Sequence, residues 1–167
     1  MSEQTNAGHT APQLHTMLTE QTVRAMIRVA SWEEAVDRAG QLLVEAGTVE
    51  PRYVKAMKRV LHEMGPYAVI APGVVLLHAR PEDGVRQPCF GMVTLSTPVA
   101  FGHRENDPVD VVIALGAVDK QAHVTALQQL AQLLLDQATV ERIRAAPDDS
   151  ALLSAIHSWN GGRAKEA

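Results

Sequence analysis

The chain has 167 residues, of which 46% are hydrophobic, and its formal net charge is −4. This length suits one domain, and with only two Trp, two Tyr and two Phe its core is expected to be mostly aliphatic. A long basic block is absent, which argues against nucleic acid as the main partner. The single Cys89 cannot form an internal disulfide, and no secretory or membrane-spanning pattern is visible. These features predict a cytoplasmic protein without direct membrane insertion.

Three regions are expected along the chain. Residues 1–20 are polar and aperiodic and predict a flexible tail, as do residues 161–167 at the other end. Between them, residues 21–160 are expected to form one domain, because no linker or repeat divides them. Its first element is a half-buried strand over residues 22–30, where apolar and polar side chains alternate.

Two helices follow this strand. Ser31 and Glu34 have the spacing of a capping box, which predicts a helix that ends at Gly47. Pro51 opens a second helix, because its missing N–H costs nothing in the first turn, and Gly65 ends it. The positions of the second helix expected to be buried are Val54, Met57, Val60, Leu61 and Met64.

The second half of the domain predicts strands and then helices. Short apolar runs separated by turn residues predict strands over residues 68–70, 74–77, 90–95 and 109–115. Further helices are expected over residues 119–135, 139–145 and 148–159, the first of them capped by Asp119. This order predicts an α/β fold in which helices flank both faces of a mixed β-sheet.

His78 is the first candidate for chemistry, because it lies between an apolar run and a charged turn. A neutral imidazole is a good nucleophile towards phosphorus at neutral pH, and the P–N bond that it forms remains transferable. The alternative is a strand-end histidine that is bonded to a backbone carbonyl group.

His123 is the second candidate, in the first turn of the helix that Asp119 is expected to cap. Strand ends that lead into helices are where α/β folds place ligands, and the free N–H groups there favour an anion. A histidine at this point can donate a hydrogen bond to a phosphoryl oxygen. The alternative is a partly exposed histidine that contacts only its helical neighbours.

Other polar residues are expected near His78 and His123. Arg80 is close enough in sequence to His78 to assist a bound phosphoryl group, whereas Glu82 and Asp83 complete the same charged turn. His103 lies in the polar loop FGHREND and is a candidate for the rim of the site.

A metal site is a further alternative for the histidines. His78, His103 and His123 could bind a metal with Glu105 or Asp107, as in a metal-dependent hydrolase, but their spacing matches no compact ligand motif. Nucleotide-binding and serine-hydrolase motifs are also absent. Neither a metal nor another cofactor is therefore expected.

Three segments in order resemble the EIIA proteins of the bacterial phosphoenolpyruvate-dependent sugar phosphotransferase system (PTS). They are VEPRYVKAM at 49–57, GPYAVIAPGVVLLHARPEDGV at 65–85 and FGHRENDPVDVVIALGAVDKQAHVTAL at 101–127. The resemblance covers about residues 18–157 and is closest to the ascorbate-type branch of the mannitol–fructose class.

The resemblance implies a role for each candidate residue. His78 would be the phosphorylated histidine and His123 the assisting one. The phosphoryl group would arrive from the phosphocarrier protein HPr and leave to a cysteine of the cognate EIIB component. EIIB would then supply the EIIC membrane transporter, which phosphorylates an ascorbate-like sugar during uptake. Glu82, Asp83 and His103 would border the partner surface, and a homodimer is a further candidate assembly.

Two positions depart from the family pattern. Leu77 stands where the family usually has proline directly before the reactive histidine. Val60 stands near the position of an arginine that assists in other branches, which leaves that role empty or to Arg80. A regulatory module, whose phosphorylation state controls a transcription factor or an enzyme, is therefore the alternative function.

Overall fold

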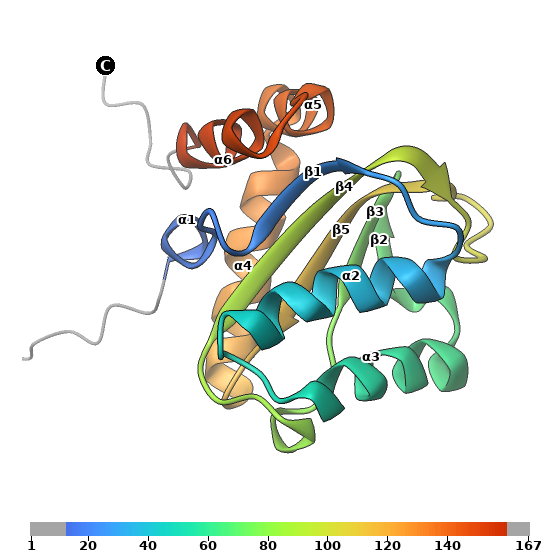
Figure 1. Ribbon diagram of the computed structural model, residues 1–167, viewed down its shortest axis with the longest axis vertical. Coiled ribbons are helices and arrows are strands. Elements are labelled where there is room, and N and C mark those ends of the chain that lie inside the picture. The colour runs from blue at the N-terminus through green and yellow to red at the C-terminus, as the bar shows by residue number, and fades with distance from the viewer. Residues whose placement is uncertain (1–12, 160–167) are drawn as a thin grey trace, which may run out of the picture.

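The computed structural model describes residues 13–159, which form a five-stranded sheet with helices on both of its faces (Figure 1). The strand order is β1-β4-β5-β3-β2. The pairs β1–β4 and β3–β5 are parallel, whereas β4–β5 and β2–β3 are antiparallel. The strands are β1 (Val23–Ile27), β2 (Val69–Ala71), β3 (Val74–Leu77), β4 (Cys89–Val99) and β5 (Val109–Gly116). The predicted mixed α/β sheet is confirmed.

Two groups of helices cover the sheet (Figure 1). The helices α2 (Trp32–Glu45) and α3 (Pro51–Met64) pack on one face. The other face is covered by α1 (Leu14–Met17), α4 (Lys120–Leu135), α5 (Gln137–Ala145) and α6 (Asp149–His157). Within residues 13–159, no helix combines the length and the apolar character needed to cross a membrane.

Side chains alternate between the two faces, as the period of a strand requires. On β3, Val74 and Leu76 join the core beneath α4, and Val75 and Leu77 join the core beneath α2 and α3. The next residue, His78, therefore continues towards the α4 side of the sheet. This alternation directs the candidate nucleophile towards the helix that carries His123.

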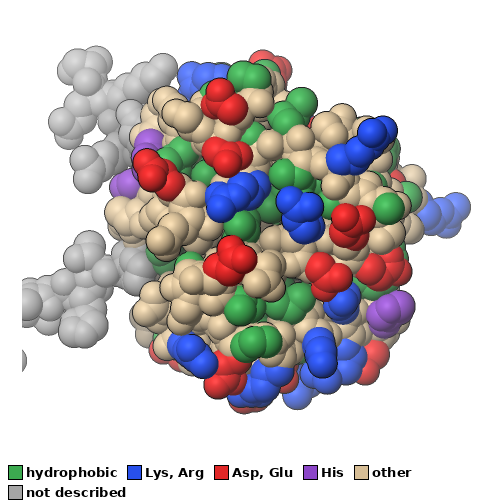
Figure 2. Space-filling view, viewed as in Figure 1, with side chains coloured by type: hydrophobic (Ala, Val, Ile, Leu, Met, Phe, Trp, Pro, Cys, Tyr) green, Lys and Arg blue, Asp and Glu red, His purple; other side chains and the backbone are tan. Residues whose placement is uncertain are grey.

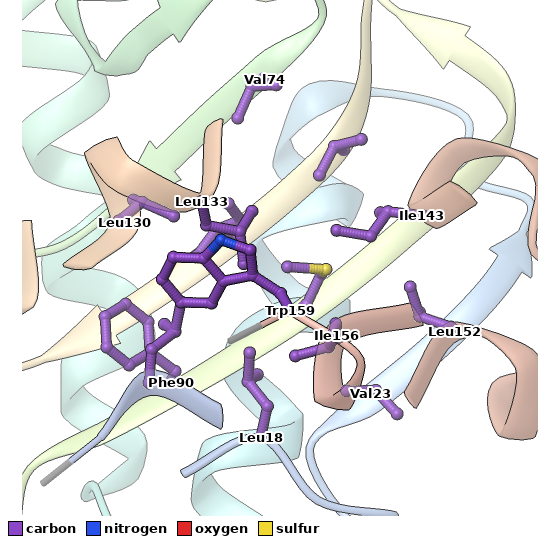
Figure 3. Close-up of a cluster of buried hydrophobic side chains, with 14 of the residues drawn as sticks. Leu18, Val23, Val74, Phe90, Leu130, Leu133, Ile143, Leu152, Ile156 and Trp159 are labelled. Atoms are coloured by element: carbon purple, nitrogen blue, oxygen red, sulfur yellow. The ribbon is translucent and has the colours of Figure 1, made fainter. Parts of the chain in front are cut away.

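The core on the α4 side reaches the last described residue. Figure 3 shows the indole of Trp159 among Phe90, Leu130 and Leu133. Trp159 is 7% exposed and Phe90 is fully buried. Burial of these two aromatic rings adds apolar area to a core that is otherwise mainly aliphatic.

The expected flexible tail over residues 1–20 is wrong for residues 13–20. Leu14 and Leu18 are both fully buried, and His157 Nε2 of α6 lies 3.0 Å from the Leu18 carbonyl oxygen. These leucines stand four residues apart and so share one side of the α1 turn. Residues 1–12 lie outside the described part of the chain, as does the expected tail over residues 161–167.

The expected helices are confirmed, with differences in their caps and buried faces. The Ser31 side chain accepts a hydrogen bond from Glu34 N, but the Glu34 carboxylate accepts from Ala30 N rather than from Ser31. The buried face of α3 is also turned from the expected one, because Met64 is 61% exposed. The residues buried on α3 are Tyr53, Ala56, Met57 and Leu61.

The face covered by α2 and α3 has no large patch of one charge. Figure 2 shows Lys and Arg side chains interspersed with Asp and Glu side chains over this face. One contributing ion pair joins Lys58 of α3 to Asp37 of α2, at 2.7 Å. Exposed pairs of this kind add little stability individually. This face is therefore a solvated outer layer of the fold.

Candidate active site

His78 directly follows β3, in a half-buried position at the end of the strand. Its Nδ1 lies 3.3 Å from the carbonyl oxygen of Leu76. A carbonyl oxygen can only accept a hydrogen bond, so this contact favours a proton on Nδ1 and leaves the lone pair on Nε2. The carbonyl contact expected for a structural histidine is thus present, and it also orients the ring as a nucleophile would need.

His123 lies opposite His78. The two ring centroids are 5.3 Å apart and the ring planes are inclined by 47°. His123 belongs to the first turn of α4, whose N-terminus is capped by Asp119, because the Asp119 carboxylate accepts a hydrogen bond from Ala122 N at 2.7 Å. Since α4 begins just after β5, and β5 is the neighbour of β3, the fold brings the two predicted histidines together.

An open cavity of about 630 Å³ lies over the two histidines. It is bordered by the end of α3, the turn that follows His78 and the start of α4. Basic and acidic side chains both line it, together with apolar ones that include Val60, Met64 and Val124. The charged lining residues are Arg59, Glu63, Arg80, Asp83, Asp119 and Lys120. An anion that entered this cavity would meet both histidines and the amino end of α4.

Burial and charge both act on His78. Burial lowers the pKa of His78 below its ordinary value, because the charged imidazolium loses hydration. The Leu76 carbonyl partly opposes this effect by stabilising the protonated ring, whereas a positive His123 lowers the pKa further. The ring of His78 is therefore neutral at pH 7, which is the form that a nucleophile requires.

The charged turn after His78 is connected to α3 by an ion pair. Asp83 accepts a hydrogen bond from Arg80 N at 3.1 Å, and its other oxygen lies 3.6 Å from Arg59 Nη2. Arg80 and Asp83 line the cavity. Glu82 is exposed next to them, and its carbonyl oxygen accepts a hydrogen bond from the Arg52 side chain. The predicted neighbours of His78 in this turn are thus close to it, with Glu82 outside the cavity lining.

His103 lies elsewhere. It belongs to the connection that precedes β5, whereas His78 follows β3 at the end where Leu77 pairs with Ala114. Since β3 and β5 are parallel, His103 is at the opposite end of the sheet, where its Nδ1 accepts hydrogen bonds from Glu105 N and Asn106 N. The three histidines are not brought together, and residues 13–159 contain no group of three His, Cys, Asp or Glu that could hold a metal ion.

Three residues at the site were not singled out from the sequence. Arg59 and Lys120 line the cavity, and Lys120 stands three residues before His123, on the same side of α4. Tyr53 is fully buried beneath the site, where its hydroxyl donates to Leu115 O and accepts from Ala79 N. Burial raises the pKa of Tyr53, so the hydroxyl keeps its proton. A tyrosine on the buried face of a helix needs partners for its hydroxyl, and that was the available signal.

The chain matches a known protein family over most of its length. The family model described as "Phosphoenolpyruvate-dependent sugar phosphotransferase system, EIIA 2" matches residues 16–159. An ascorbate-specific PTS system EIIA component from Salmonella typhi is 41% identical over 140 residues, which are 83% of this chain and 91% of that protein. The chain belongs to this EIIA family, and the predicted resemblance to it and to its ascorbate-specific members is confirmed.

Solved structures agree with this assignment. The mannitol-specific cryptic phosphotransferase enzyme IIA of Escherichia coli has a TM-score of 0.79 at 27% identity, over 89% of this chain and all 100% of that one. The mannitol IIA enzyme of E. coli in complex with its phosphorylated IIB enzyme has a TM-score of 0.72 at 25% identity, over 83% and 96% of the two chains. The fold is thus that of the mannitol-type IIA proteins.

Proposed function

We propose that this protein is a phosphoryl carrier of the PTS, which accepts a phosphoryl group from phospho-HPr on Nε2 of His78. It passes the group to a cysteine of a cognate EIIB component, which works with an EIIC transporter. The proposal places the carrier in the cytoplasm, on the route of an ascorbate-like sugar, because ascorbate-specific EIIA components are among its relatives.

The paired histidines over the open cavity carry this proposal. With its Nδ1 proton directed at Leu76 O, His78 presents Nε2 as the atom free to attack phosphorus. As the new P–N bond forms, the P–N bond of phospho-HPr breaks and its electron pair returns to the HPr histidine. The His78 ring then gains positive charge, which the Leu76 carbonyl oxygen stabilises through the Nδ1 proton.

Groups on the opposite wall are placed to stabilise the phosphoryl oxygens. His123 would donate a hydrogen bond to them from its ring, and the amino end of α4 adds a favourable dipole. Arg80 and Lys120 line the same cavity and would reduce the negative charge that develops during transfer. Their positive charges would take the role of the arginine that other branches of the family have near the position of Val60.

The rim of the cavity would serve both protein partners in turn. A thiolate of EIIB would form the P–S bond as the P–Nε2 bond breaks and its electrons return to His78. Met64 and Val124 are 61% and 51% exposed on this rim, Asp83 lines the cavity, and Glu82 is exposed in the same turn. An apolar centre with a polar edge is typical of protein interfaces, and transient partners bury the smaller areas.

A phosphorylation assay tests the proposal. The protein is incubated with labelled phosphoenolpyruvate, enzyme I and HPr, and then with a purified EIIB. We expect an acid-labile, base-stable phosphate that disappears when EIIB is added and that His78→Ala abolishes. The matched control is His62→Ala, which removes an exposed histidine of α3 that packs on Trp32 of α2. This variant should retain the phosphate. Equal labelling of His78→Ala and the native protein would refute the proposal.

A further inference from the structure

The strands β3 and β5 separate just where the site begins. Their last paired residues are Leu77 and Ala114. At the start of the ladder, Val111 N donates a hydrogen bond to Gly73 O. Alternate residues form the bonds of a parallel ladder, so the pattern continues through the odd residues of β3. Its next bond beyond Leu77 would run from Ala79 N to Leu115 O.

The hydroxyl of Tyr53 takes the place of that bond. Ala79 N donates to Tyr53 Oη at 3.0 Å, and Tyr53 Oη donates to Leu115 O at 2.6 Å. One side-chain hydroxyl from α3 thus satisfies both backbone groups and keeps the two strands apart. Tyr53 is fully buried, so water cannot substitute for it from the surface.

This bridge joins the chain segments that carry the two histidines. Ala79 directly follows His78, whereas Leu115 is close to the end of β5, from which the chain enters α4 and reaches His123. The Tyr53 ring belongs to the core beneath α2 and α3, and the histidines meet on the α4 side. Tyr53 therefore acts on the site through the backbone and not through contact with the reacting atoms.

We propose that Tyr53 is a positioning residue for phosphoryl transfer, an inference that rests on the proposed function. Its hydroxyl sets the separation of the ends of β3 and β5, and with it the distance between His78 and His123. A direct backbone hydrogen bond spans ~2.9 Å, so its formation would draw the strand ends together by roughly 1–2 Å. A displacement of about 1 Å at a reacting centre can cost ~100-fold in rate.

Tyr53→Phe tests the inference, because it keeps the ring and removes only the hydroxyl. We expect phosphorylation of His78 to slow by about 10- to 100-fold, both from phospho-HPr and from phosphoramidate as a small donor. The KM for phospho-HPr should change less than the rate, since Tyr53→Phe replaces no side chain of the rim. The titration midpoint of His78, followed by NMR, should shift as its surroundings change.

Thr94→Val is the matched control. Thr94 is 2% exposed, and its hydroxyl accepts a hydrogen bond from Met26 N at 2.8 Å, between β1 and β4 and away from the cavity. This variant also loses a buried hydroxyl that satisfies a backbone group, but we expect it to keep the native rate and the native titration of His78. If Tyr53→Phe is slowed no more than Thr94→Val, or leaves the titration of His78 unchanged, the positioning role is refuted.

Hydrogen exchange gives a test that does not depend on the variant. In the native protein, the Ala79 amide should be protected although it lies beyond the end of β3, because it donates to Tyr53. Exchange at the rate of an open loop would show that the bridge is absent. If the native protein accepts no phosphoryl group, the proposed function fails, whereas exchange at Ala79 and titration of His78 still report on the bridge.

Discussion

The carbonyl oxygen of Leu76 lies 3.3 Å from Nδ1 of His78, so the strand that ends at the site also selects which ring nitrogen is free. The two residues are separated by one position, which places both on the α4 side of β3. The backbone would thereby support a positive His78 ring during the proposed transfer, while burial favours the neutral ring before it.

Phosphoryl acceptance should depend on pH through His78. Because burial lowers its pKa, the midpoint of the fall in acceptance rate should lie below pH 6.5, its ordinary value. Rates at different pH, with phosphoramidate as donor, measure this midpoint, and NMR titration of the His78 ring should give the same value. A midpoint at or above 6.5 would contradict the assigned environment.

The same shift should affect stability. Between the lowered pKa of folded His78 and 6.5, the unfolded chain binds more protons than the folded one, so stability falls as the pH falls through this window. In His78→Asn this contribution is absent, and the free energy of unfolding should vary less with pH over the same range. Denaturant unfolding at several pH values compares the two proteins. Identical pH profiles would show that burial of His78 has no such effect.

His123→Ala should remain folded but accept phosphoryl groups more slowly. A positioned donor contributes roughly 100-fold or more to such a reaction, and the loss should appear in the maximal rate. The His78 midpoint should also rise, because a positive His123 lowers the pKa of His78. Stopped-flow rates and NMR titration measure the two effects. An unchanged rate together with an unchanged His78 midpoint would show that His123 has no role in phosphoryl transfer.

Exposed apolar residues on the rim should contribute to partner binding and not to the chemistry. Val124→Ser should raise the KM for phospho-HPr by roughly 10-fold, since it removes an apolar contact at the interface without adding a charge to the cavity. The rate with phosphoramidate should stay native. Leu135→Ser is the control, because Leu135 is 81% exposed at the far end of α4. Equal effects of the two substitutions would locate the interface elsewhere.

His103→Ala tests whether the opposite end of the sheet takes part in phosphoryl transfer or in partner binding. Its Nδ1 accepts hydrogen bonds within its own loop, so the substitution should loosen that loop and lower the free energy of unfolding by about 1 kcal/mol. The rate of phosphoryl acceptance and the KM for phospho-HPr should both remain native. A raised KM would instead extend the partner surface to His103.

Local patterns in the sequence were sufficient for much of the fold and for the central pair. Asp119 could be identified as a helix cap, and the apolar runs as strands, because these signals depend on adjacent residues. The position of His103 could not, since only the strand order and directions decide which end of the sheet a loop occupies. The packing of α1 was also hidden, because four residues form a helix only where tertiary contacts such as those of Leu14 hold them.

Only part of the candidate site could likewise be predicted from the sequence. His78 and His123 lay in segments that resemble the family, but the turn of α3 that buries Tyr53 could not be fixed from the pattern of its apolar residues. That pattern favoured Met64, which instead borders the cavity. The bridge from Tyr53 to Ala79 depends on three elements that are distant in sequence, so the partners of the hydroxyl could not be identified from local patterns.

The identity of the phosphorylated atom decides whether His78 is the phosphoryl acceptor. The protein, labelled with ¹⁵N in its histidines, is phosphorylated by phospho-HPr and its ring nitrogens are assigned by NMR through their coupling to phosphorus. We expect a single phosphorylated histidine, His78, with the phosphorus on Nε2 and the proton retained on Nδ1 towards Leu76. Phosphorus on Nδ1 of His78, or on any other histidine, would contradict it.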